Sequence, residues 1–297
     1  MINLKPEVVA QLERVLGSVE MLLPRAVKRV DWSSCYAANW RRHSFSGYLE
    51  PVKVTDATSL DELLGVEKQK EIMINNTRQF LAGLPANNAL LWGSRGTGKS
   101  SIVKALLNRY APEGLRVIQV EKEDLIYLSE IFNAVENELY RFILLCDDLT
   151  FEVGELSYKM LKSALDGSVY SAPENVLIYV TSNRRHLLPE YETDHIGGKF
   201  VNGELQQSEA MEEKVSLSDR FGLWIAFHAF SQERYIDAVR LCIEREAREL
   251  GEDIPWSREL ELDAIQWSRD KSKRCGRTAY QFSKNWVGKY LLTKREE

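Results

Sequence analysis

Short apolar runs alternate along the chain with longer stretches whose apolar residues recur every three or four positions. Each run is too short for a helix and is bounded by polar or turn-forming residues, which is typical of a buried strand. The longer stretches have the spacing that places apolar side chains on one face of a helix. This alternation predicts parallel βαβ units. The expected strands are residues 89–92, 115–120, 142–146, 176–181 and 223–227, with helices between them that include 124–140 and 155–166.

The part of the chain after the last expected strand is predicted to be entirely helical. Apolar residues keep a helical spacing there, and the expected helices are residues 231–250, 258–269 and 277–292. Residues 186–217, which lie between two expected strands, are polar and rich in Glu, Gly and His. A hairpin turn is expected within this insert at Asn202-Gly203.

The first part of the chain is predicted to be a helical extension. Residues 7–30 have the pattern of two short helices. Trp32, Tyr36 and Trp40 follow at positions i, i+4 and i+8, which would place the three rings on one face of a helix. Two interpretations are open. The rings pack on the following domain, or, with the arginines that follow them, they stack on single-stranded nucleic acid or dock a partner.

An extended linker is expected from Gly47 to Thr58, which places a domain boundary near residue 50. The sequence Ser59-Leu60-Asp61-Glu62 then matches the capping box, in which two side chains satisfy free N–H groups at a helix start. A helix is expected to follow and to end at Leu81, just before Gly83 and Pro85.

Composition narrows the class of protein. With 297 residues and a hydrophobic share of 44%, the chain has room for about two globular domains. A net charge of −5 means that any contact with nucleic acid would need a local patch. The four cysteines lack the close spacing of a zinc site and fit a reducing compartment. No signal-peptide core or membrane-length apolar run is present, so a cytoplasmic protein without membrane contact is expected.

The most specific motif is Gly93-Ser94-Arg95-Gly96-Thr97-Gly98-Lys99-Ser100, which fits G-x-x-x-x-G-K-[ST]. An expected strand precedes it and an expected helix follows, as a phosphate-binding loop requires. Its glycines let backbone N–H groups turn inward, where they and the helix N-terminus can hold phosphate oxygens. Lys99 would reach the β- and γ-phosphates, Ser100 would hold Mg²⁺, and Ser101 would complete the phosphate-binding segment. The alternative is a glycine-rich turn before an ordinary helix.

Polar residues follow two later buried strands of the predicted sheet, with the strand 115–120 lying between them and the loop in the sequence. Asp147-Asp148 follows the strand 142–146, and Asn183 follows the strand 176–181. Ligands bind at the carboxyl edge of such sheets. Asp147 is placed to hold Mg²⁺, and Asp148 to orient or deprotonate an attacking water. Asn183 could hydrogen-bond a γ-phosphate oxygen or that water. The alternative is a solvated strand end followed by a turn.

This arrangement resembles the AAA+ ATPases over most of residues 59–292. The resemblance implies a three-layer P-loop α/β domain with a parallel sheet and a C-terminal α-helical lid. Within that superfamily, the sequence is similar to a bacterial family known only as a domain of unknown function (eight-fifteen). The matching segments are Leu64-Gly65-Val66 beside the adenine, Walker A at Gly93–Ser100, Walker B at Phe142–Asp148, sensor 1 at Asn183, an arginine-finger box at Leu217–Gly222 and sensor 2 at Gly276–Ala279.

The resemblance also implies an activity and an organisation. The domains would be an N-terminal helical extension (1–50), the nucleotide-binding domain (51–230) and the lid (231–297). ATP, rather than GTP, would bind with Mg²⁺ and be hydrolysed in a homo-oligomer that acts on an unknown protein or nucleic-acid partner. Arg220 would enter a neighbouring subunit's site as the arginine finger, and Arg277 would contact the phosphates from the lid. Otherwise Arg220 pairs with Asp219, and Arg277 belongs to a solvated basic helix end.

One residue departs from the AAA+ pattern. Walker B motifs of that superfamily usually end in Asp-Glu, whereas the second acid here is Asp148, which is one methylene shorter. Because small misplacements of catalytic groups are costly, slow hydrolysis is expected unless Glu152 assists. Two other functions therefore stay open. One is an ATP-dependent loader or scaffold switch with little turnover, and the other is a small-molecule kinase.

Overall fold

The computed structural model describes residues 8, 9, 11, 14 and 29–296 except 44–45, 54–57, 153–154, 167–171, 186, 188–198, 202–203 and 207–216. The two short helices expected within residues 7–30 therefore lie mostly outside the described residues. So does the turn Asn202-Gly203, although the short strands β7 (Lys199–Val201) and β8 (Glu204–Gln206) pair antiparallel on either side of it, as a hairpin requires.

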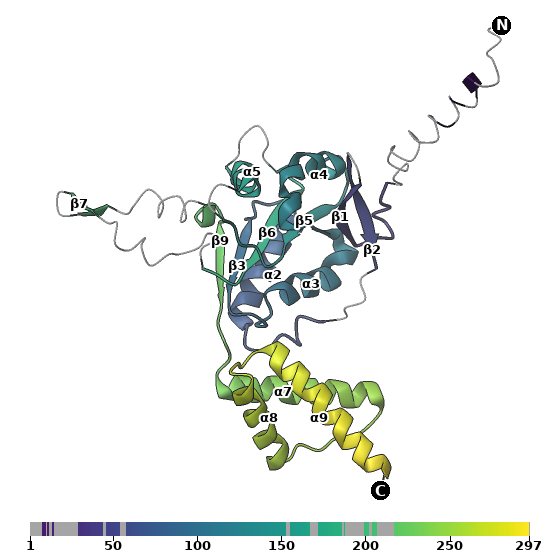
Figure 1. Cartoon of the computed structure of the whole chain (residues 1–297), viewed down its shortest axis with the longest axis vertical. Helices are drawn as coiled ribbons and strands as arrows, with labels where there is room; N and C mark the ends of the chain where they lie inside the picture. Colours follow the sequence, from purple (N-terminus) through teal and green to yellow (C-terminus); the bar gives the residue numbers. More distant parts are fainter. Residues whose placement is uncertain are drawn as a thin grey trace.

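A seven-stranded sheet forms the centre of the described structure, in the order β2-β1-β4-β5-β6-β3-β9 (Figure 1). All neighbouring strands are parallel except β1 and β2, which form an antiparallel pair at one edge. The strands are β1 (Ala37–His43), β2 (Ser46–Val52), β3 (Ala89–Gly93), β4 (Leu115–Gln119), β5 (Arg141–Cys146), β6 (Val176–Ser182) and β9 (Leu223–Phe227).

Helices cover both faces of the sheet, which gives the three layers expected for a P-loop α/β fold. One face packs against α4 and α5, and the other packs against α2 and α3. Residues of β5 alternate between the two cores, with Leu144 facing the first and Ile143 the second. Burial on both faces explains why these strands are continuous apolar runs. The helices are α2 (Glu67–Leu81), α3 (Lys99–Tyr110), α4 (Leu128–Val135) and α5 (Leu156–Leu165).

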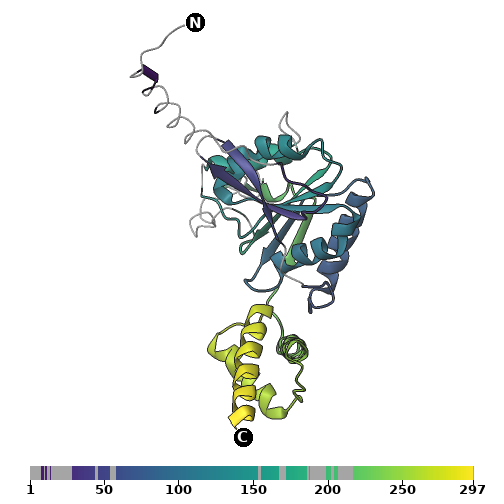
Figure 2. The same ribbon diagram turned by 90° about the vertical axis from the view of Figure 1, so that its right-hand side faces the viewer.

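Three further helices, α7 (Gln232–Leu250), α8 (Arg258–Asp270) and α9 (Gly276–Glu296), pack around a core of their own at the end of the α/β domain (Figures 1 and 2). We call this unit the lid. The side chains of Ser231 and Ser257 cap α7 and α8 by accepting bonds from the N–H groups of Arg234 and Leu260. Among the described helices, none has the length and apolar character needed to cross a membrane.

The helix expected through Trp32, Tyr36 and Trp40 is wrong, because residues 37–43 form β1. Trp32 and Trp40 are buried in the core, whereas Tyr36 is 43% exposed, so the three rings do not share a face. Pairing with β2 and β4 satisfies the backbone of this segment, and that gain overrides a weak helical spacing. The segment expected as a linker contains β2, so residue 50 lies inside a strand. The division into three domains remains a prediction.

Two other local expectations need correction. Ser59 and Glu62 do exchange the two capping-box hydrogen bonds, at 3.2 and 3.3 Å, but residues 60–66 form turns and α2 begins at Glu67. The helix expected over 124–140 is shorter, because Lys122–Tyr127 is a 3₁₀ helix and α4 ends at Val135. The expected strands and helices from residue 89 onward that lie in the described part of the chain, other than 124–140, are confirmed to within a few residues at their ends.

Candidate nucleotide-binding site

The loop between β3 and α3 is shaped by three glycines with positive φ. Gly93, Gly96 and Gly98 have φ angles of 127°, 80° and 100°, which residues with a Cβ rarely adopt. A Cβ on Gly93 would lie 2.0 Å from the carbonyl oxygen of Phe227, so only glycine lets the loop start this close to β9. The Ser94 N–H donates to that same oxygen at 3.1 Å. The loop is therefore anchored on the neighbouring strand before it turns.

Lys99, at the first position of α3, is buried inside the loop. Its ammonium donates to the carbonyl oxygens of Gly93 and Ser94, both at 2.9 Å, and to Oδ1 of Asn183 at 3.2 Å. Burial lowers the pKa of Lys99, and the carboxylates of Asp148 and Asp147 oppose that shift. The lysine thus joins the loop to the end of β6 and carries a desolvated positive charge.

The acidic residues expected after β5 meet the loop and the end of β6. Oδ1 of Asp147 accepts hydrogen bonds from the hydroxyls of Ser100 and Thr181. Asp148 has a left-handed backbone with φ of 53°, and its N–H donates to the Thr181 hydroxyl at 2.9 Å. The amide of Asn183 donates to Oδ1 of Asp148. The structure therefore brings together, at one edge of the sheet, residues that lie far apart in the chain.

The oxygen atoms at this edge fit a magnesium ion. The Ser100 hydroxyl and the Asp147 carboxylate are the hard oxygen ligands that Mg²⁺ prefers, and their mutual hydrogen bond shows that both can reach one point. Within the described residues, no group of three His, Cys, Asp or Glu side chains forms a complete metal site. Mg²⁺ held here would need further oxygens, which phosphates and water supply in such sites.

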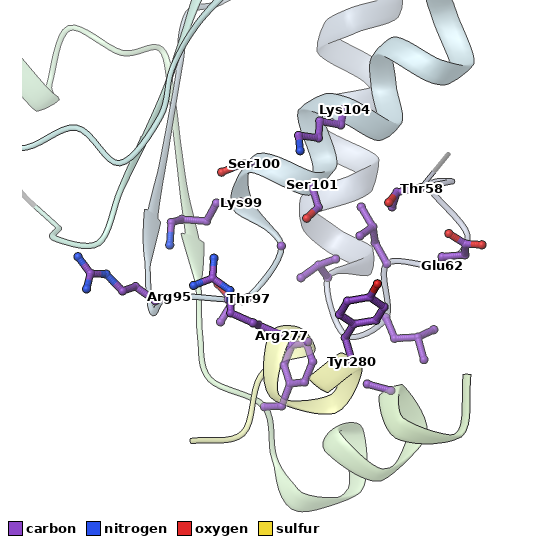
Figure 3. Close-up of a pocket in the computed structure, with 18 of the residues that line it drawn as sticks. Thr58, Glu62, Arg95, Thr97, Lys99, Ser100, Ser101, Lys104, Arg277 and Tyr280 are labelled. Atoms are coloured by element: carbon purple, nitrogen blue, oxygen red, sulfur yellow. The ribbon is translucent and has the colours of Figure 1, made fainter. Parts of the chain in front are cut away.

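A cavity of about 770 Å³ extends from the loop to the lid (Figure 3). One end is lined by the phosphate-loop segment from Arg95 to Ser101 and by Asp147, Asp148 and Asn183. The other end is lined by apolar residues that include Leu63, Leu64, Val66, Phe230 and Leu241, and also by the charged residues Glu62 and Arg245. Its charged and apolar ends match the triphosphate and the base of a nucleotide.

Only two of the three residues expected beside the adenine, Leu64-Gly65-Val66, line the cavity. Leu64 and Val66 line the apolar end, but Gly65 does not. Gly65 has φ of 72° and turns the chain beside the lid, where a Cβ would lie 3.3 Å from Cδ of Arg234. Of the loop residues, Gly93 and Ser94 also lie outside the cavity lining, and they serve to anchor the loop.

The lid closes one side of the cavity. The N–H of Arg277 lies 3.3 Å from the carbonyl oxygen of Gly96, and a Cβ on Gly96 would lie 2.7 Å from Sγ of Cys275. Figure 3 shows the Arg277 side chain directed from α9 toward Lys99. Lid residues Tyr280 and Arg245 also line the cavity and were not predicted from the sequence. The helical spacing of Arg277 and Tyr280 is the signal that could have found the tyrosine.

Two further expected residues, Arg220 and Glu152, do not line this cavity. Arg220 forms an ion pair with Asp166. Glu152 is absent from the lining, and its backbone N–H donates to the carboxylate of Glu155 at 2.7 Å. Within one chain, the site therefore contains Arg277 but not Arg220.

This fold and site define an AAA+ type P-loop protein. The chain belongs to a family described as "Protein of unknown function (DUF815)", which matches residues 33–290. Both assignments agree with the resemblance drawn from the motifs.

Solved structures with similar folds include the Thermotoga maritima RuvB Holliday junction branch migration motor, with a TM-score of 0.52 and 17% identity, covering 80% of this chain and 66% of that one. Another is the replication initiator DnaA bound to AMPPCP and single-stranded DNA, with a TM-score of 0.50 and 15% identity, covering 82% and 70%. The replication factor C large subunit of Ignicoccus hospitalis is 35% identical over 60 residues, which are 20% of this chain and 13% of that protein. These likenesses establish the fold and no particular activity.

Proposed function

We propose that this protein is a magnesium-dependent ATP hydrolase of the AAA+ type. The observation that carries the proposal is the meeting of Lys99, Ser100, Asp147, Asp148 and Asn183 around one cavity that has an apolar end. Hydrolysis would drive changes within a cytoplasmic homo-oligomer that acts on a protein or nucleic-acid partner. RuvB is a Holliday junction branch migration motor and DnaA was solved with single-stranded DNA, which supports a nucleic-acid partner as the class to test first.

The proposed reaction is attack of water on the γ-phosphorus. A bond forms from the water oxygen to this phosphorus, and the bond from phosphorus to the β–γ bridging oxygen breaks. The bridging oxygen keeps the electron pair on ADP, and a water proton passes to Asp148 and then to solvent. Asn183 would orient the water or a γ-phosphate oxygen, and Lys99 would stabilise charge on the β- and γ-phosphates. When bound by Ser100 and Asp147, Mg²⁺ neutralises phosphate charge.

Steady-state phosphate release with magnesium and ATP tests this proposal. Replacing Asp148 by asparagine is expected to lower turnover by about a hundredfold or more and to leave nucleotide affinity within a few fold. The matched control is Asp237→Asn, an exposed lid position that does not line the cavity. Full turnover by the Asp148→Asn variant would show that Asp148 is not the base.

The alternative is a nucleotide switch with little turnover. The contacts of Asp148 favour this alternative. Asn183 donates to one carboxylate oxygen and Arg95 pairs with the other, so neither oxygen is free to accept a proton from water. In that case ATP would bind without phosphate release, and partner binding alone would depend on nucleotide. A small-molecule kinase would instead transfer the γ-phosphate to an acceptor other than water.

Arg220 is proposed to complete the site of a neighbouring subunit. Light scattering with a non-hydrolysable ATP analogue is expected to detect an oligomer. Arg220→Ala is expected to lower turnover by about a thousandfold, as loss of an arginine finger does elsewhere. Mixing it with Lys99→Ala is expected to restore part of the activity, because mixed oligomers pair an intact site with an intact Arg220.

The matched control for the mixing experiment is Arg248→Ala, at an exposed position of α7. A protein that stays monomeric with the analogue, or mixtures that recover no activity, would contradict action in trans.

A further inference from the structure

Arg95, at a variable position of the phosphate loop, lies beside the shortened acid of the Walker B motif. Its NH2 atom is 3.5 Å from Oδ2 of Asp148. Figure 3 shows the Arg95 side chain leaving the loop in a direction away from Tyr280 of the lid. Arg95 therefore approaches the carboxylate from the loop, whereas Arg277 enters the cavity from α9.

The other contacts of Asp148 leave only one of its carboxylate oxygens for Arg95 to hold. Asn183 donates to Oδ1, and the backbone N–H is bound to the Thr181 hydroxyl, so the main chain and one oxygen are already fixed. Arg95 lies nearest the second oxygen, Oδ2. Aspartate has one methylene fewer than the usual glutamate, so it cannot adjust its reach by a further rotation. Its position therefore depends on the groups that hold both oxygens.

We infer that Arg95 is a positioning residue that acts through Asp148 and holds this carboxylate in the orientation needed for water attack. The inference rests on the proposed hydrolytic function. Arg95 also lines the phosphate end of the cavity with Lys99 and Arg277, so direct contact with phosphate is the alternative, but its guanidinium is engaged with the acid. An exposed ion pair adds little stability, so the effect is expected in turnover rather than in folding.

A double-mutant cycle tests the inference. Arg95→Ala is expected to lower kcat about tenfold and to change KM by less than about threefold, since it removes positioning rather than substrate contacts. In the Asp148→Asn background, the same change is expected to have no further effect on kcat, because the group through which Arg95 acts is absent. Arg95→Lys is expected to recover part of kcat, because lysine keeps the positive charge but lacks the planar guanidinium of arginine.

The control is Arg78→Ala, an exposed arginine of α2, and affinity for a fluorescent ATP analogue is measured for every variant. If Arg95→Ala lowers kcat equally with and without Asp148, or mainly weakens nucleotide binding, Arg95 acts on phosphate and the inference alone is wrong. A wild-type protein that binds ATP but releases no phosphate would overturn the hydrolytic function and this inference with it.

Discussion

Replacing Arg116 by methionine is expected to lower the free energy of unfolding by about 3–5 kcal/mol. Arg116 is only 3% exposed and lies in β4. Its guanidinium donates twice to the carbonyl oxygen of Trp32, at 2.8 and 2.6 Å, and once each to those of Ala111 and Leu115. Methionine fills much of the space but donates no hydrogen bond, so buried carbonyl groups lose their partners.

The same side chain fixes the segment that leads into β1. Its guanidinium carbon lies 4.8 Å from the ring centre of Tyr36 and 4.0 Å from that of Tyr140, a distance at which cation–π attraction is effective. Urea unfolding followed by circular dichroism measures the effect as a lower midpoint. The matched control is Arg109→Met, an exposed position of α3, which is expected to change stability by about 0.5 kcal/mol or less. Equal midpoints for the two variants would contradict a structural role for Arg116.

Most of the sheet could be predicted because its central strands are buried on both faces. Every residue of a run such as 142–146 is apolar, because both faces of the strand are buried, so the hydrophobic pattern alone identifies it as a strand. The edge pair β1 and β2 could not be found in this way. Arg41 and Glu50, which face solvent there and form an ion pair, interrupt any apolar run, and pairing with β4 is a long-range interaction.

The phosphate end of the site could also be predicted, since it lies where a loop and two strand ends meet in any parallel sheet of this order. Asp147 and Asn183 were placed by that rule and are confirmed as neighbours of the loop through Ser100 and Lys99. The apolar end could be predicted only in part, because Leu64 and Val66 were expected there but Tyr280 and Arg245 reach the cavity from lid helices whose placement depends on tertiary packing. Tyr280 follows Arg277 at a helical spacing, whereas Arg245 belongs to no motif.

Lys99→Ala is expected to reduce phosphate release by at least about a hundredfold and to weaken ATP binding. The ammonium lies at the centre of the loop, bonded to Gly93, Ser94 and Asn183, where backbone and amide groups replace water. A buried cation, which is shielded from water, stabilises phosphate charge far more than an exposed lysine does. Phosphate release and titration with a fluorescent ATP analogue measure the two effects separately.

The Lys99→Ala variant is expected to lose activity but to remain folded. Burial lowers the pKa of Lys99, so the unfavourable burial of its charge offsets part of what its three hydrogen bonds contribute, and a smaller loss of stability than for Arg116→Met is expected. A urea midpoint between those of the wild type and Arg116→Met would show this. The control is Lys68→Ala, an exposed lysine of α2, for which activity and affinity should stay at wild-type values. Because a collapsed loop would lower the midpoint and the activity together, a stable but inactive Lys99→Ala variant would assign the loss to the missing charge. Undiminished turnover would place the phosphates elsewhere and overturn the proposed site.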